Sequence, residues 1–219
     1  MDTAANCHVA ERGLSSRNVK YTGGMSPTKP RGQYAKGAER REQIIQTATD
    51  VFATEGFEGT ALKRVAELVG VKEATLFHYF SGKQELLTAV LTERDRRSRE
   101  LDTREPGLAG LAPIAERNRQ EPGLTTLYAV ASATANDPGH ASHDYFRNRY
   151  AELVEELAQD VRQGQLAGDV RGDLSAESLA RLVIAAFDGL QLQWLYDKNV
   201  DMAAGLSELI EVLMAPGEA

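Results

Sequence analysis

The sequence predicts an all-helical protein, in which an N-terminal three-helix domain with a helix-turn-helix precedes a larger helical domain. Apolar residues make up 42% of the 219-residue chain and aromatic residues only 6%, so Ala and Leu dominate the apolar set. Both are strong helix formers. Apolar residues recur three and four positions apart along much of the chain, as on one face of a helix. Long alternating runs rich in Val, Ile and Thr are not found, so we expect no sheet.

Residues 1–37 predict a basic arm that is mostly disordered. They contain few large apolar side chains, are rich in small polar residues and carry a net charge of +4. Such a composition does not bury enough apolar surface to offset the entropy of folding. Met25 offers an alternative start, so residues 1–24 need not belong to the natural protein.

The first helix is predicted from about residue 38 to residue 55. Ile44, Ala48 and Phe52 share one face at helical spacing, and this face is expected to be buried. Gly56 ends the helix, because glycine adopts the left-handed conformation found at helix C-termini without a steric cost.

Residues 60–83 (TALKRVAELVGVKEATLFHYFSGK) predict two short helices joined by a tight turn. Val65 and Val69 mark the apolar face of the first short helix, Thr60 is placed to cap it, and Gly70 ends it. The second begins near Val71. Helices this short are not stable alone in water. Paired across a glycine-containing turn, they form a helix-turn-helix whose second helix can enter a DNA major groove.

A long fourth helix is predicted over residues 82–102, with a capping box between Ser81 and Gln84. Pro and Gly residues then predict breaks near residues 104–107, 121–123 and 137–139. Further helices are expected near residues 108–119, 124–136, 141–165, 175–196 and 201–214, with Ser175 and Asp201 as caps of the last two. We divide the chain into the arm, a DNA-binding domain at 38–84 and a regulatory domain at 85–219.

The string TLFHYF at residues 75–80, followed by Lys83 and ELL at 85–87, resembles the DNA-binding domain of the tetracycline-repressor (TetR) family. The preceding helix, with RREQII at 40–45 and Gly56-Phe57, fits the same pattern. This resemblance implies a transcriptional regulator, usually a repressor released from its operator by a small molecule. It also implies a homodimer, a pseudo-palindromic double-stranded DNA operator and a ligand-binding domain in the second half.

The residues expected to read bases lie at the N-terminal end of the second short helix. Lys72, Glu73 and Thr75 can present donors, acceptors or a methyl group to base edges, and the small Ala74 allows close approach. In the family, phosphates are held at positions that match Thr60, Phe77, His78 and Lys83. Phe77 replaces the tyrosine common there and removes a hydroxyl, and Glu73 replaces a frequent lysine. Both departures imply a distinctive or weaker operator.

The basic arm is the third expected DNA contact. Residues 91–219 carry a net charge of −9, which phosphates would repel, so a few placed groups must bind DNA. Arg31, Tyr34 and Lys36 are predicted to lie in the minor groove or along the backbone, as flexible arms do in homeodomains.

The second half is expected to bind a small lipophilic or aromatic effector and to dimerise. Aromatic and amide side chains commonly line such pockets. The candidates are Tyr128, Phe146, Tyr150, Gln191 and Trp194, with ordinary core packing as the alternative for each. Apolar stripes on the last two helices predict a four-helix bundle across a two-fold axis. These stripes are Leu179, Leu182, Val183, Ala186, Leu190 and Leu195, then Leu206, Leu209, Ile210 and Leu213.

Two alternatives from other classes remain open. His140 and His143, with Asp137 and Asp144, have a spacing that could hold a metal in an enzyme, although capping residues at a helix start are the favoured interpretation. No phosphate-binding loop, dinucleotide fingerprint, serine elbow or HExxH motif is present, so no enzyme and no cofactor are expected. The other alternative is a DNA-binding module without an effector.

The remaining features indicate a cytoplasmic protein. Cys7 is the only cysteine, which excludes an internal disulfide and suits a reducing compartment. No apolar run approaches the roughly 18 residues of a membrane-spanning helix, and the N-terminus lacks the apolar core of a signal peptide.

Overall fold

The computed structural model describes residues 31–101 and 107–214, and these form nine α-helices, one 3-10 helix and no strand. The all-helical class is confirmed for this part of the chain. The elements are α1 (Arg31–Glu55), α2 (Leu62–Val69), α3 (Glu73–Leu76), α4 (Lys83–Leu101), η1 (Gly107–Gly110), α5 (Leu111–Gln120), α6 (Pro122–Thr134), α7 (His143–Ala167), α8 (Ala176–Tyr196) and α9 (Met202–Met214).

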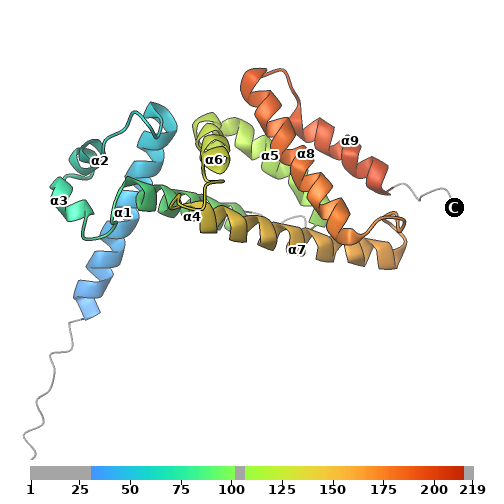
Figure 1. The fold of residues 1–219 in the computed structure, drawn as a ribbon, viewed down its shortest axis with the longest axis horizontal. Helices are drawn as coiled ribbons and strands as arrows, with labels where there is room; N and C mark the ends of the chain where they lie inside the picture. The colour runs from blue at the N-terminus through green and yellow to red at the C-terminus, as the bar shows by residue number, and fades with distance from the viewer. Residues whose placement is uncertain (1–30, 102–106, 215–219) are drawn as a thin grey trace, which may run out of the picture.

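The first three helices gather at one end of the molecule, and α8 and α9 lie at the other (Figure 1). Between the two ends, α4 leads away from α1 and runs beside α7, to which ion pairs and hydrogen bonds join it. The predicted boundary at residues 84 and 85 therefore falls inside α4. One continuous helix connects the N-terminal helices with the second half of the chain.

The helix-turn-helix is built around a small apolar core. Ile44 and Phe52 of α1 are fully buried against Val65 of α2 and Leu76 of α3. Gly70 ends α2 with φ of 76°, the left-handed conformation that the sequence predicted for it. The apolar spacing and this glycine thus produce the local structure expected from them.

The first helix starts earlier than predicted. It begins at Arg31 rather than near residue 38, so residues 31–37 are helical and not part of a disordered arm. The reason is that helix formers such as Ala35 and Lys36 outweigh Gly37, which costs only about 1 kcal/mol inside a helix. The rest of the predicted arm, including Cys7 and Met25, lies outside the described residues.

Helix capping is partly as predicted. The Ser175 side chain accepts a hydrogen bond from the Ser178 amide (3.2 Å), and the Asp201 carboxylate accepts one from the Ala204 amide (3.0 Å). The capping box before α4 is different, because the helix begins one residue later than expected. That shift places Glu85, not Gln84, at the third helical position, where its carboxylate accepts the Ser81 amide at 2.6 Å.

The prediction that Thr60 caps α2 is wrong. Ala61 occupies the N-cap position, with no side-chain hydrogen bond. The Thr60 hydroxyl instead donates to the Gly56 carbonyl oxygen at 2.7 Å, and the residue is only 3% exposed. Thr60 therefore stabilises the turn between α1 and α2 rather than the start of α2.

Helix α6, in the second half of the chain, packs against α1. The break expected at residues 121–123 is found at Glu121 alone, since Pro122 already starts α6, where its fixed φ suits the first helical position. Gly123 then packs directly on α1. A Cβ atom at this position would lie 2.1 Å from the Ala53 carbonyl oxygen, so only glycine permits this approach.

Some residues of the apolar stripes predicted for dimerisation are buried in the monomer, and others are exposed. Leu179, Val183 and Leu206 are fully buried inside the monomer, because α8 packs against α7 and α9 packs against α5. Leu182 is 58% exposed, whereas Leu209 and Ile210 of α9 are half-buried. Val212, which was not among the predicted positions, is 60% exposed. Only part of each predicted stripe is thus available to a second copy.

Candidate DNA interface and effector pocket

The four residues expected to read bases lie together at one end of the short helix α3. Lys72 is its N-cap, Glu73 and Ala74 are exposed, and Thr75 is half-buried. The next residue, Leu76, is 1% exposed and anchors the helix in the core. Leu76 therefore fixes α3 against the core, while Lys72, Glu73 and Ala74 remain exposed to solvent.

The residues expected to contact phosphates lie in three different environments. Phe77 is 53% exposed, so it is not a core residue, and His78 beside it is also exposed. The Lys83 ammonium lies 3.2 Å from the Glu58 carbonyl oxygen. Lysine has two further donors, whereas the buried Thr60 hydroxyl donates its single proton to the Gly56 carbonyl oxygen. Phe77, His78 and Lys83 are thus the members of this set with accessible side chains.

Two basic residues expected in the arm lie on α1. Arg31 is its first residue, and Lys36 is exposed one turn and a half later. The sequence did not indicate Arg41, whose guanidinium lies 5.0 Å from the ring centroid of Phe80, next to the helix-turn-helix. A cation stacked on a buried aromatic ring is a contact that only the tertiary structure brings about.

A pocket of about 150 Å³ lies between α4 and four helices of the second half of the chain, α5, α6, α7 and α8. Of the five predicted pocket residues, Tyr128 and Gln191 line it. Its other lining residues are Arg94, Asp95, Ser98, Arg99, Leu111, Ile114, Asn118, Arg149, Leu153, Glu156, Val183, Ile184, Phe187 and Asp188.

The other three predicted pocket residues lie elsewhere. Phe146 is 5% exposed and packs edge-to-face on Tyr128, with ring centroids 5.4 Å apart. Trp194 belongs to a separate core cluster and carries Lys198 over its ring at 3.4 Å. Tyr150 does not line the pocket, but its hydroxyl donates to Asp188, which does, at 2.8 Å. Large aromatic rings on these helices mostly fill the core.

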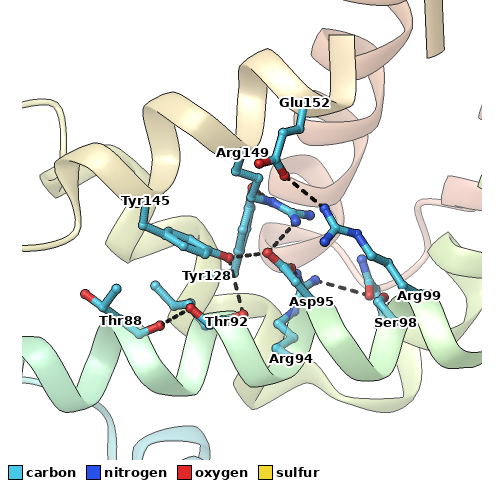
Figure 2. A network of polar contacts seen from close by, with 12 residues as sticks. Thr88, Thr92, Arg94, Asp95, Ser98, Arg99, Tyr128, Tyr145, Arg149 and Glu152 are labelled. Atoms are coloured by element: carbon cyan, nitrogen blue, oxygen red, sulfur yellow. Dashed lines mark hydrogen bonds and ion pairs between the residues drawn. The ribbon is translucent and has the colours of Figure 1, made fainter. Parts of the chain in front are cut away.

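A charged network that the sequence did not indicate joins α4 to α7 beside the pocket. Asp95 of α4 faces α7, where the Tyr145 hydroxyl donates to its carboxylate and the Arg149 guanidinium forms an ion pair with it (Figure 2). The Asp95 side chain is only 9% exposed. A carboxylate this buried requires such partners, because an unpaired charge in this environment is costly.

Tyr128 brings together Arg94 and Arg149, two of the three arginines that line the pocket. The Arg149 Nε donates to the Tyr128 hydroxyl at 3.0 Å, and the guanidinium carbons of Arg94 and Arg149 lie 4.6 and 5.3 Å from the ring centroid. Burial lowers the pKa of Arg94, and the neighbouring Arg149 charge lowers it further. Burial also raises the pKa of the Tyr145 phenol and of the Asp188 carboxyl.

Amide side chains continue this polar network across the pocket. Arg94 donates to the Asn118 side-chain oxygen at 3.4 Å, and the Asn118 amide donates to Gln191 at 3.0 Å. Asn118 and Gln191 are 6% and 3% exposed. A chain of hydrogen bonds therefore links α4, through α5, to α8.

The histidines considered as metal ligands make contacts within the protein. The His140 Nδ1 accepts the Ser142 amide at 3.1 Å, and the His143 Nδ1 lies 2.9 Å from the Ala135 carbonyl oxygen. The His143 contact ties the start of α7 to the end of α6. Among the residues that the structure describes, no three His, Cys, Asp or Glu side chains are grouped so as to hold a metal ion. Nor does any described helix combine the length and apolar character needed to cross a membrane.

Comparison with known proteins assigns both halves of the chain to one family. Residues 44–90 match the family model "Bacterial regulatory proteins, tetR family", and residues 114–214 match "BetI-type transcriptional repressor, C-terminal". The HTH-type transcriptional repressor Rv1474c of Mycobacterium tuberculosis is 25% identical over 177 residues, which cover 80% of this chain and 92% of that protein.

Solved structures agree with this assignment. A transcriptional regulator from Saccharomonospora viridis in complex with choline is 25% identical, with a TM-score of 0.66 over 80% of this chain and 96% of its own. The regulator FadR from Bacillus subtilis, in complex with stearoyl-CoA, shares the fold at 18% identity, with a TM-score of 0.63 over 80% of this chain and 97% of its own.

Proposed function

The chain belongs to the TetR family of helix-turn-helix transcriptional repressors, which are not enzymes, and from this we propose that it is a homodimer released from a pseudo-palindromic operator by a small effector. The proposed division of labour assigns DNA binding to residues 38–84 and effector binding and dimerisation to residues 85–219. The proposed place of action is the cytoplasm.

The proposal that an effector controls DNA binding is supported by the course of α4. The helix begins at Lys83, beside the helix-turn-helix, and reaches the pocket at Arg94 and Asp95. The twelve residue-to-residue steps from Lys83 to Asp95 span about 18 Å of helix axis. A ligand that contacts Arg94 or Asp95 acts on the same rigid element that positions the DNA-reading residues.

In a dimer, a movement of α4 caused by the ligand would change the distance between the two recognition helices. Two recognition helices must lie about 34–36 Å apart to enter successive major grooves on one face of DNA. The exposed apolar residues of α8 and α9, including Leu182 and Val212, support a two-fold interface at the end remote from α3. A ligand with different affinities for the two spacings would shift the equilibrium between them.

The effector is proposed to be small and partly apolar. Apolar side chains from α5, α7 and α8 form much of the pocket wall. The two relatives crystallised with choline and stearoyl-CoA support a ligand site in this type of domain. A DNA-binding module without an effector would not require such a pocket.

Binding to DNA from the protein's own promoter region tests the proposal. Fluorescence anisotropy should show tighter binding to this duplex than to an unrelated duplex of equal length, and light scattering should show a dimer. Lys83→Ala should weaken binding to both duplexes, whereas Thr75→Ala should mainly reduce the preference between them. Lys198→Ala, a lysine change at the far end of the molecule, is the matched control. A monomer with equal affinity for both duplexes would contradict the proposal.

A further inference from the structure

The pocket has one apolar side and one end dominated by two arginines. Leu111 and Ile114 of α5 and Val183 and Phe187 of α8 contribute to the apolar side. At the other end, the guanidinium groups of Arg94 and Arg149 both lie over Tyr128. A ligand that fills this space must therefore meet apolar groups and cations together.

Arg94 is poorly compensated within the protein. Its contacts with Asp95 (3.5 Å) and Asn118 (3.4 Å) are both long, although a guanidinium carries five N–H donors. Among the described residues, each fully buried side-chain nitrogen or oxygen has a hydrogen-bond partner. Because Arg94 lines the pocket, its remaining donors have access to that space.

The carboxylates of the pocket are already engaged. Asp95 is bound by Arg149 and by the Tyr145 hydroxyl, so it neutralises at most one of the two guanidinium charges. Asp188 accepts the Tyr150 hydroxyl at 2.8 Å; burial raises the pKa of its carboxyl, while this hydrogen bond and the charges of Arg149 and Arg94 act in the opposite direction. The two exposed charges at the rim, Arg99 and Glu156, have opposite signs and add no net charge.

A cationic ligand is disfavoured by the same geometry. Cations such as quaternary ammonium groups are usually bound on the faces of aromatic rings. Tyr128 is the aromatic ring beside the charged end, and two guanidinium groups already lie over it. A third cation would displace one of them and meet the other.

We infer that the pocket binds a small organic monoanion, whose acid group pairs with Arg94 and Arg149 while its apolar body packs between α5 and α8. A volume of about 150 Å³ suits one aromatic ring or a chain of about six carbon atoms. The arginine fork matches a carboxylate with two parallel hydrogen bonds. This inference rests on the proposed function, since it specifies the effector of that same pocket.

Binding of the acid group would also affect the DNA-binding end of the molecule through α4. The acid group would compete with Asp95 for Arg149 and so weaken the ion pair that joins α4 to α7. The contact between Arg99 and Glu152 (3.1 Å) is exposed and weak, so it would not hold the two helices in its place.

Three compounds of matched shape and different charge test the ligand class. Phenylacetate, 2-phenylacetamide and 2-phenylethylamine are titrated into the full-length protein at pH 7 by isothermal titration calorimetry. Phenylacetate is expected to bind at least about tenfold more tightly than either other compound. Equal affinities, tighter binding of the amine, or no measurable binding of phenylacetate would overturn the inference.

Matched arginine variants locate the acid group. Arg94→Gln should reduce the preference for phenylacetate over the amide to near onefold. Arg96→Gln should keep it, because Arg96 lies two residues along α4, pairs with Glu93 and Glu100 and does not line the pocket. If circular dichroism shows that Arg94→Gln is unfolded, Arg94→Lys replaces it and should lose part of the preference, since lysine lacks the fork. An unchanged preference in the folded variant contradicts the assignment.

Operator binding separates this inference from the proposed function. Phenylacetate, and not the amide, should weaken operator binding in the anisotropy assay. Selective binding of phenylacetate without an effect on operator affinity would retain the ligand class and refute effector control. Release of the operator by the amide or the amine alone would refute the ligand class and retain effector control.

Discussion

Replacing Asp95 by asparagine removes the buried charge that joins α4 to α7. Asparagine keeps the size of the side chain and can still accept one hydrogen bond from Arg149 or Tyr145. It removes the carboxylate that forms ion pairs with both Arg94 and Arg149. We therefore expect Asp95→Asn to destabilise the folded protein and to loosen α4 from α7.

The magnitude follows from the burial of the three groups. Removing one partner of a buried ion pair typically costs about 3–5 kcal/mol. The side chains of Arg94 and Arg149 are 11% and 17% exposed, so water in the pocket can solvate them partly. We expect a loss near the lower limit, about 3 kcal/mol. For a domain of this size, that corresponds to a fall in Tm of about 6–12 °C.

Thermal unfolding by circular dichroism measures this change, at one protein concentration because a dimer's Tm depends on it. Asp144→Asn is the matched control. Asp144 pairs with Arg147 at 3.1 Å on the surface of α7, where both side chains are mostly exposed, so its loss should cost less than about 1 kcal/mol. Equal changes in Tm for the two variants would refute the idea that the Asp95 pair is a buried link.

Two further predictions concern packing and pH. Gly123→Ala should lower the free energy of unfolding in urea by about 1–3 kcal/mol, because its methyl group meets the Ala53 carbonyl oxygen. Gly37→Ala, with nothing within 4 Å, should instead raise it by about 0.5–1 kcal/mol, and a similar loss in both would contradict this reasoning. Hydrogen bonding to Arg96 lowers the pKa of Glu93 from 4.5 to about 2, so Glu93 stabilises the fold above pH 4.5 and loses this effect as the pH falls towards 2. The difference in Tm between the wild type and Glu93→Gln should therefore shrink over that interval, and a difference independent of pH would exclude the proposed pairing.

The helix-turn-helix could be predicted because its signals are local. The end of α2 depends on the conformational freedom of Gly70, and the burial of Val65 and Leu76 follows from their spacing. The caps at Ser175 and Asp201 likewise bond amides only three residues ahead. The errors at the start of α1 and in the capping box of α4 arose where a glycine was given too much weight or a helix began one residue later. The error at Thr60 arose because its hydroxyl bonds the preceding turn rather than the start of α2.

The pocket could not be predicted in the same way. Residues 93–100 of α4 (ERDRRSRE) have the composition of a solvated helix face, and nothing in their spacing indicates that Arg94 and Asp95 are buried. The predicted aromatic candidates Phe146 and Trp194 fill the core instead, because bulky rings pack equally well against other helices. The charges that line the pocket were therefore missed.

From its residues alone, this chain specified its helical class, the place of most helices and the helix-turn-helix, because helical spacing and capping involve residues at most four positions apart. The tertiary structure alone decided which charges are buried together. Asp95 and Arg149 are 54 residues apart, and they meet only because α4 packs beside α7. The proposed effector site depends on that packing, whereas the proposed DNA-reading surface lies within one short stretch of sequence.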